Sequence, residues 1–392
     1  MESDFPRVTN VILQVHTDEV WNIAWSHDGL YLASASRDKN AIIWRTGPSA
    51  AHEAGPHQDW TPHFVLRDHP YPVGCLAWSK DDSVLLTSSD NYIKLWNTKT
   101  GVCINTVNEH TDMVTALSWL PDGLGFISGG LDCRIIHWEA DGKPHDAWGA
   151  TALRITDLAV TSDFTRLVTV GMEIQPRLPS TIEVTQSRGA PDGDAPTPSG
   201  GNPSKGAHWM IVFDLTTKQT ELSICLEGEL TSVKVSQNSQ YALINHSPDE
   251  IHLWDLKAGR LARKYTGQRQ GRHVIKSCFG GIEGKFVVSG SEDGNVYAWH
   301  RDTGALLEVL AGHGEGTVNS VAWHPRNERM FASCSDDNTI RIWEAPPPQL
   351  SIDSNLHNPS RTPAFPDKGK GKPQQRWDED DVDSVSDSNA TP

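Results

Sequence analysis

Several features that would point to a membrane, secreted or metal-binding protein are missing from this sequence. No apolar run reaches membrane-spanning length, and the first ten residues hold acids and a proline without an apolar core, so we expect no signal peptide. Six cysteines are spread over 392 residues, and no two stand at Cys-x-x-Cys spacing. We therefore expect neither a disulfide framework nor a zinc site, and interpret the cysteines as small core residues in a reducing compartment.

Positive charge is also scarce. The formal net charge is −16 at pH 7, which would repel a phosphate backbone, so we expect no nucleic-acid partner and no membrane partner. These absences favour a cytoplasmic protein. A basic run at Lys368–Lys372 would add a nuclear location if it acts as a nuclear signal, although a solvated tail is the simpler interpretation.

What the chain does contain is a repeat. A pattern recurs about every forty to fifty residues: a His, an alternating strand, then Ser-x-x-x-Asp, then a strand that ends in Trp. The complete sets are His16, Ser34, Asp38 and Trp44; His110, Ser128, Asp132 and Trp138; and His313, Ser333, Asp337 and Trp343. Repeats of four short strands at this period stack radially into a β-propeller.

Seven such repeats account for most of the chain, which predicts an all-β, seven-bladed propeller. The first three run from His16 to Trp44, from His69 to Trp96 and from His110 to Trp138; the fourth is degenerate, with strands at Ile155–Val160, Arg166–Val170 and Trp209–Phe213; the last three end at Trp254, Trp299 and Trp343. The seventh repeat supplies only three strands. We expect the unpaired strand Val11–Val15 to complete the last blade and close the ring, with an open arc as the alternative.

The predicted domain organisation follows from these repeats. Residues 1–10 form an N-terminal extension, residues 11–345 form the propeller, and residues 346–392 form a disordered polar and acidic tail. Two inserts interrupt the blades. Thr46–Thr61 lies in the first blade, and residues 173–207 in the fourth are rich in Pro, Gly and Ser, which predicts a flexible segment.

A His, a Ser and an Asp in each repeat suggest a hydrolase triad, but the repetition argues against one. A triad needs one exposed nucleophile beside an oxyanion hole, whereas this set recurs with its Asp six residues before a Trp. We interpret it as a buried network in which Asp binds His, His meets Ser, and Ser meets the Trp ring N–H. We therefore predict no catalytic, metal or cofactor-binding residues.

Three repeats depart from the complete set and should form softer blades. The second has His69, Asp90 and Trp96 but one residue fewer between its second and third strands. The fifth keeps Trp254 with Pro248 in the Asp place. The sixth has Gln268 where the His should stand, with Ser289, Asp293 and Trp299.

The repeats resemble the WD-repeat family, and within it the WD-repeat subunit of the GID/CTLH ubiquitin ligase. The stretches that carry the resemblance are Glu19–Trp21 with Asp38 and Ile42–Trp44, Ile251–Leu256, Arg263–Tyr265, and above all Ser277–Gly281 followed by Ser289–Asp293. The resemblance spans about Val11 to Ala345. It implies a non-catalytic scaffold that recruits substrates or regulators for proteasomal degradation, with other ligase subunits and protein substrates as partners.

In that family a helical LisH–CTLH region precedes the propeller. Here the chain starts almost directly at the expected closing strand, so we expect either a fragment or a propeller that stands alone. The substrate and the oligomeric state stay open. An adaptor of a cullin ligase is an alternative, but Trp254-Asp255-Leu256-Lys257 has Lys where such adaptors carry Arg. A propeller hydrolase is a third and weaker alternative.

Partners of a propeller bind its faces. The loops between blades and those between second and third strands share one face, and positions near the start of each first strand or just before the turn Asp should be exposed there. These candidate partner-binding residues are Glu19, Trp21, Arg37, Met113, Thr115, Leu131, His273, Ile275, Glu292, Asn319 and Asp336. Exposed aromatic and Arg side chains are good interface anchors. Packing of Trp21 and Ile275 between blades is the alternative.

Overall fold

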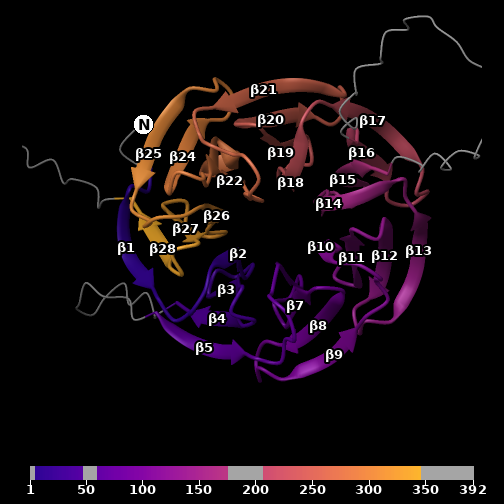
Figure 1. The fold of residues 1–392 in the computed structure, drawn as a ribbon, viewed down its shortest axis with the longest axis horizontal. Coiled ribbons are helices and arrows are strands. Elements are labelled where there is room, and N and C mark those ends of the chain that lie inside the picture. Colours follow the sequence, from indigo (N-terminus) through magenta and orange to yellow (C-terminus); the bar gives the residue numbers. More distant parts are fainter. Residues whose placement is uncertain (1–4, 47–59, 175–205, 346–392) are drawn as a thin grey trace, which may run out of the picture. The chain divides into compact units, whose positions relative to one another are not determined.

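Seven four-stranded antiparallel sheets stand around a central axis in the computed structural model, which describes residues 5–46, 60–174 and 206–345 (Figure 1). Blades 1 to 3 are β2 (Val20–Trp25), β3 (Tyr31–Ser36), β4 (Ala41–Arg45) and β5 (Thr61–Leu66); β6 (Cys75–Trp78), β7 (Val84–Ser89), β8 (Tyr92–Asn97) and β9 (Cys103–Val107); and β10 (Val114–Trp119), β11 (Gly125–Gly130), β12 (Arg134–Glu139) and β13 (Pro144–Ala150). The predicted seven-bladed propeller is confirmed.

The remaining blades repeat this arrangement. Blades 4 and 5 are β14 (Leu153–Val160), β15 (Arg166–Glu173), β16 (His208–Asp214) and β17 (Thr220–Leu226); and β18 (Glu229–Val235), β19 (Tyr241–Ser247), β20 (Glu250–Asp255) and β21 (Arg260–Thr266). Blade 6 is β22 (Cys278–Gly280), β23 (Phe286–Ser289), β24 (Asn295–His300) and β25 (Leu306–Ala311), with a 3₁₀ turn, η2 (Ile282–Gly284). Blade 7 is β26 (Val318–Trp323), β27 (Met330–Ser335), β28 (Ile340–Glu344) and β1.

The N-terminal strand closes the ring, as predicted. β1 (Val8–Leu13) pairs antiparallel with β28, with Leu13 opposite Ile340. The predicted boundary at residue 11 is wrong, because β1 begins at Val8 and the Phe5 side chain is buried in the aromatic cluster of blades 6 and 7. Most of the two inserts (residues 47–59 and 175–205) and the predicted tail (residues 346–392) lie outside the described residues.

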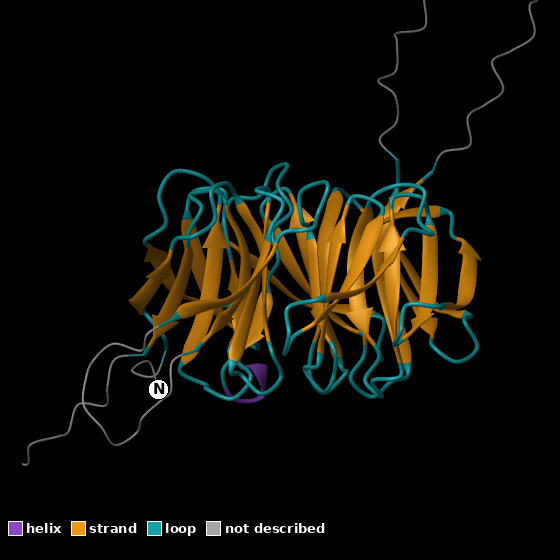
Figure 2. Cartoon of the chain, turned by 90° about the horizontal axis from the view of Figure 1, so that it is seen from below, coloured by secondary structure: helices purple, strands orange, loops and turns teal. Residues whose placement is uncertain are grey.

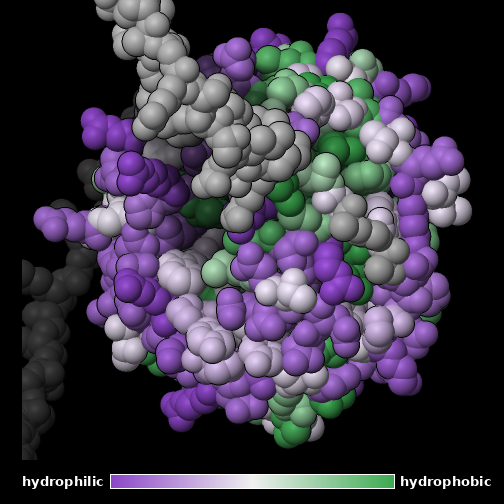
Figure 3. All heavy atoms as spheres, turned by 45° about the vertical axis from the view of Figure 1, so that its right-hand side comes forward, coloured by the Kyte–Doolittle hydropathy of each residue, from purple (hydrophilic) through white to green (hydrophobic). Residues whose placement is uncertain are grey.

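Loops lie at the two edges of the ring (Figure 2). We call the upper face the one that carries the loops joining each fourth strand to the next blade and each second strand to its third. The lower face carries the other two sets of loops, including η2. In the oblique view of Figure 3, hydrophobic residues gather around the hollow at the middle of the molecule and hydrophilic residues cover much of the rim.

Hydrogen bonds join the innermost strands at all seven blade junctions. From blade 1 to blade 4, Asn22 Nδ2 donates to the Gly74 carbonyl at 3.2 Å, Cys75 Sγ donates to Thr115 O at 3.0 Å, and Thr115 Oγ1 donates to Ile155 O at 2.7 Å. Thr156 Oγ1 then donates to Leu230 O at 2.7 Å, and Ser232 Oγ donates to Ile275 O at 2.8 Å. The Lys276 N–H donates to Asn319 O at 2.8 Å, and Asn319 Nδ2 donates to Val20 O at 3.0 Å, which returns to blade 1. The blades are therefore linked around the whole axis by polar contacts in addition to apolar packing.

Tryptophans at the ends of first strands add a second set of links. The ring N–H groups of Trp25, Trp78 and Trp119 donate to the carbonyls of Ala322, Ala24 and Ala77 in the preceding blades, at 3.0, 3.0 and 3.2 Å. Trp323 occupies the same place in blade 7 but packs on Gly280 instead. A Cβ on Gly280 would lie 2.1 Å from a carbon of this ring. The unusual Ser-Cys-Phe-Gly-Gly stretch thus has a packing reason.

We predict that Gly280→Ala destabilises the propeller by roughly 1–3 kcal/mol, because the rigid indole of Trp323 and the aromatic cluster around it must move. Gly74→Ala is the matched control, since its added Cβ would meet only Ser88 Oγ at an ordinary 3.8 Å. Chemical denaturation of both variants measures the difference. Equal stability of the two variants would contradict this account of Gly280.

Candidate functional site

The repeated polar sets form chains of hydrogen bonds inside blades 1, 3 and 7, as the sequence indicates. In blade 3, His110 Nε2 lies 2.7 Å from Ser128 Oγ, which accepts the Trp138 ring N–H at 2.7 Å, and His110 Nδ1 lies 2.9 Å from Asp132. In blade 1 the His16–Ser34, Ser34–Trp44 and His16–Asp38 distances are 2.7, 2.9 and 2.8 Å. In blade 7 the His313–Ser333, Ser333–Trp343 and His313–Asp337 distances are 2.7, 2.8 and 3.1 Å.

The ionisation of these groups suits a structural role. Burial lowers the pKa of His110 and of His313, so both imidazoles are neutral near pH 7. Burial alone would raise the pKa of Asp38, but the hydrogen bond and charge of His16, with backbone N–H donors, lower it to about 2. The Ser hydroxyls are fully buried and already engaged by His and Trp, so they cannot reach a substrate. No nucleophile in these three networks is available for catalysis.

Blade 2 departs from the predicted network. Thr87 replaces the Ser and binds both His69 Nε2, at 2.8 Å, and the Trp96 ring N–H, at 2.9 Å. Asp90 does not take the Asp place, because the turn is one residue shorter, and His69 Nδ1 lacks a hydrogen-bond partner among the described residues. Burial, with the nearby Lys94 ammonium, lowers the pKa of His69 to about 4.

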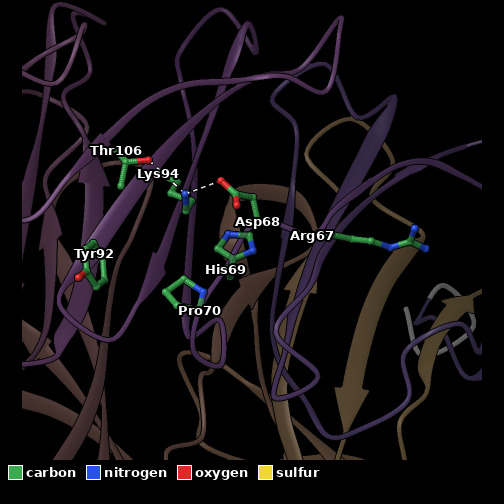
Figure 4. Close-up of a pocket in the computed structure, with 7 residues that line it drawn as sticks. All are labelled: Arg67, Asp68, His69, Pro70, Tyr92, Lys94 and Thr106. Atoms are coloured by element: carbon green, nitrogen blue, oxygen red, sulfur yellow. Dashed lines mark hydrogen bonds and ion pairs between the residues drawn. The ribbon is translucent and has the colours of Figure 1, made fainter.

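A cavity of about 430 Å³ opens beside His69 (Figure 4). Lys94 lies in it and donates to Asp68 at 2.9 Å and to Thr106 at 3.2 Å, as the dashed lines show. The Lys94 side chain is 9% exposed, and the Asp68 side chain is 77% exposed. The ammonium is thus already neutralised by an adjacent carboxylate, and none of the predicted partner-binding residues lines this cavity.

Blades 5 and 6 also depart from the complete set, as predicted. In blade 6 the Trp299 ring N–H donates to the Thr266 carbonyl at 3.1 Å, Tyr297 donates to Asp293 at 2.7 Å, and the Gln268 side-chain amide has no partner among the described residues. In blade 5, Trp254 Nε1 is likewise unpaired. Whether these blades are softer stays a prediction.

The upper face brings together one compact group of predicted residues in blade 1. Glu19 accepts the Trp21 ring N–H on Oε2 at 2.9 Å and the Arg37 guanidinium on Oε1 at 2.7 Å. Trp21 is half-buried, and the Arg37 side chain is 52% exposed. One carboxylate therefore holds an aromatic and a cationic side chain in fixed positions, and both keep surface available to a partner.

Met113, Leu131 and His273 also reach the surface. Met113 is 47% exposed and His273 is exposed, whereas Leu131 is half-buried. Arg154, which the sequence analysis missed, donates to the Leu131 carbonyl and to Asp112, both at 3.3 Å. A second patch on blades 3 and 4 thus combines apolar side chains with a guanidinium.

Four of the predicted partner-binding residues make contacts within the propeller. Thr115 donates to the next blade, Ile275 and Asn319 are buried with exposures of 0% and 4%, and half-buried Asp336 accepts from Asn319 and the Thr317 N–H. Glu292 stays half-buried at the surface, where it accepts from the Gly271 and His273 N–H groups. The expected exposure of Ile275 and Asn319 is wrong. By strand register Phe279 takes the place of Trp25, so Ile275 stands where Trp21 stands in blade 1, but its side chain is buried and the neighbouring Val274 is exposed instead.

Tyr71 was missed as well. It is 48% exposed between two prolines in the loop that enters blade 2. The repeat pattern gives no side-chain role to this position, so an aromatic residue there was the available signal.

Comparisons with known proteins agree with the propeller. The family described as "WD domain, G-beta repeat" matches residues 8–45, 60–97, 101–139, 259–300 and 304–344. The chain belongs to the WD-repeat family. It is 37% identical over 346 residues to the WD repeat-containing protein WDS homolog of Arabidopsis thaliana. The matched region covers 86% of this chain and 58% of that protein.

Two further relatives are similar. GID complex subunit 7 of Schizosaccharomyces pombe is 37% identical over 92% of this chain and 61% of that protein. WD repeat-containing protein 26 homolog of Arabidopsis thaliana is 34% identical over 86% of this chain and 50% of that protein. The chain therefore spans about half to three-fifths of the length of these relatives. In the part of the chain that the structure describes, no helix has the length and apolar character to span a membrane.

We predict that Asp132→Ala destabilises the protein by roughly 1–3 kcal/mol, because it leaves the buried His110 Nδ1 unpaired. Glu109→Ala is the control, since this exposed acid stands beside His110 in the same loop. Urea unfolding compares the two. If Asp132→Ala proves as neutral as the control, the network does not fix the blade.

We predict that His69 makes stability fall as the pH drops from about 6.5 to 4. The unfolded chain binds a proton at His69 over this interval and the folded chain does not, so the contribution is complete above pH 6.5 and is lost towards pH 4, up to about 3 kcal/mol. The slope of unfolding free energy against pH should be shallower in His69→Gln. An unchanged slope in that variant would contradict the prediction.

Proposed function

We propose that this propeller is the partner-binding part of a GID/CTLH-type ubiquitin ligase subunit. The first support for this assignment comes from a relative. A protein called a GID complex subunit is 37% identical to this chain over 92% of its length. The family resemblance of the sequence rests above all on the blade 6 stretch Ser277–Gly281, in which Gly280 accommodates Trp323. The proposed role is non-catalytic: the chain holds other ligase subunits and recruits protein substrates or regulators, in the cytoplasm and, if the basic run acts as a signal, in the nucleus.

The observation that carries the proposal is the placement of Trp21. In blades 3, 4 and 7 the equivalent positions are Thr115, Thr156 and Asn319, and each side chain links its blade to the next. In blade 1 the neighbouring Asn22 makes that link instead. Trp21 is therefore not needed to join blades, and Glu19 holds its ring at the upper face beside Arg37.

This arrangement has the properties of a protein-binding anchor. Trp and Arg are the side chains that most often dominate interface energies. Because Glu19 already fixes both, little side-chain freedom is lost when a partner binds. The second patch at Met113, Leu131 and Arg154 adds apolar area in blades 3 and 4. Together they favour capture of a protein segment across the upper face.

No comparable arrangement favours an enzyme. The repeated His-Ser-Asp sets are occupied by internal hydrogen bonds. In the cavity beside His69, Lys94 is paired with Asp68 and hydrogen-bonded to the Thr106 hydroxyl, so these groups are engaged with one another. A scaffold that captures proteins is therefore the function that these residues support best.

We predict that Trp21→Ala combined with Arg37→Ala abolishes recovery of the RING and CTLH-domain ligase subunits in a tagged pull-down from native extract read by mass spectrometry. The thermal midpoint should stay within a few degrees, because neither side chain links blades. Leu124→Ala is the control, since Leu124 is 75% exposed in a loop on the lower face.

Three results would count against this proposal. Failure of the unmodified chain to recover ligase subunits would reject the assignment to this complex. Recovery that survives in the double variant would place the binding surface elsewhere. A large fall in the thermal midpoint would show that Trp21 and Arg37 belong to the core.

A further inference from the structure

Blade 5 has lost the polar network and gained two buried histidines in its place. In blade 1 Ser34 of β3 stands opposite Ile42 of β4, and in blade 3 Ser128 stands opposite Ile136. In blade 5 the order is inverted, with Ile244 on β19 opposite His252 on β20. Two residues further along β19 stands His246, where blades 1, 2, 6 and 7 carry a serine. The imidazoles therefore come from the central strands and not from the entry loop.

The two histidines lie against each other in a site that is closed to solvent. Their ring centroids are 4.6 Å apart with an interplanar angle of 16°, and the residues are 8% and 5% exposed. They share the blade face of Ile244 and Trp254, which packs against blade 4.

Hydrogen bonds assign the proton on each ring. His246 Nε2 contacts the Glu227 carbonyl, and His252 Nε2 lies 2.6 Å from a Glu250 carboxylate oxygen. Both partners only accept hydrogen bonds, so each ring donates from Nε2, which leaves Nδ1 as the atom that a metal could bind. Neither Nδ1 has a hydrogen-bond partner among the described residues, although both atoms are buried.

A buried ring nitrogen without a partner is costly, and metal-binding histidines have this arrangement. A histidine that ligates a metal donates its other ring N–H to a carboxylate or a backbone carbonyl, and His246 Nε2 has such an acceptor in the Glu227 carbonyl. Glu250 now accepts hydrogen bonds from His252 and Lys264, and it must give up the one from His252 to ligate a metal held by that ring. One ligand atom from each of His246, Glu250 and His252 can be chosen so that all lie within 4.8 Å of one another.

We propose that His246, His252 and Glu250 bind one zinc ion between blades 4 and 5. The sequence-based expectation of no metal site is thereby replaced. Zinc at about 2.0–2.2 Å from each ligand needs its donor atoms closer together than 4.8 Å, so modest side-chain rotations must accompany binding. Lys264 Nζ, now 2.9 Å from Glu250, has a side chain that is 48% exposed and can turn to solvent.

The test is calorimetric titration of zinc into the chelator-treated full chain. We expect one zinc per chain at this site, and a rise in thermal midpoint with zinc, because a ligand that binds only the folded state stabilises it. The variant His246→Ser with His252→Ile carries the residues that blade 1 has at these positions. It should bind zinc at this site at least tenfold more weakly. His273→Gln, which removes an exposed histidine, should bind as the unmodified chain does.

Two results would overturn the proposal: no zinc bound by the unmodified chain, or the same affinity and stoichiometry in the double variant. If the double variant does not fold, X-ray absorption at the zinc edge of the loaded unmodified chain decides instead. Two imidazole nitrogens per zinc support the site, and a first shell with sulfur or only oxygen rejects it. The proposal does not depend on ligase membership, since neither experiment requires a partner.

Discussion

Closure of the ring is the constraint on which the rest of this structure depends. Each blade alone has two apolar faces, and only neighbours on both sides cover them. β1 supplies the outer strand of blade 7 from the other end of the chain, so the last blade is complete only when β1 pairs with β28. The hydrogen bonds around the axis then join every blade to the next, from Asn22 round to Asn319.

The internal networks and the inter-blade links divide the polar residues between two tasks. The His–Ser–Trp chains with their Asp fix the geometry within blades 1, 3 and 7. The Thr, Ser and Asn side chains near the axis fix how blades meet. Because both sets are satisfied internally, a residue that resembles a catalytic or surface group in the sequence can be wholly structural. Thr115 and Asn319 are examples.

Departures from the repeat mark the places where other properties can arise. Blade 1 moves its link to Asn22 and leaves Trp21 at the upper face, where Glu19 holds it beside Arg37. Blade 5 replaces its network with His246 and His252, whose Nδ1 atoms lack partners among the described residues. Neither change disturbs the four-stranded sheet, because apolar packing and backbone pairing still hold it. A closed repeat can thus accept local substitutions that a single small core would not.

The sequence by itself determined the number of blades, the closing strand and the members of the three complete networks. These follow from strand periodicity and fixed offsets, which are local properties of the chain. Only the tertiary structure decided which residues near the first strands face a partner. That outcome depends on the register in each blade and on contacts with the next, so Ile275 and Asn319 became buried while Val274 and Tyr71 reached the surface. The histidine pair of blade 5 likewise required the pairing of β19 with β20, because the approach of two side chains across strands is set by register and not by spacing along the sequence.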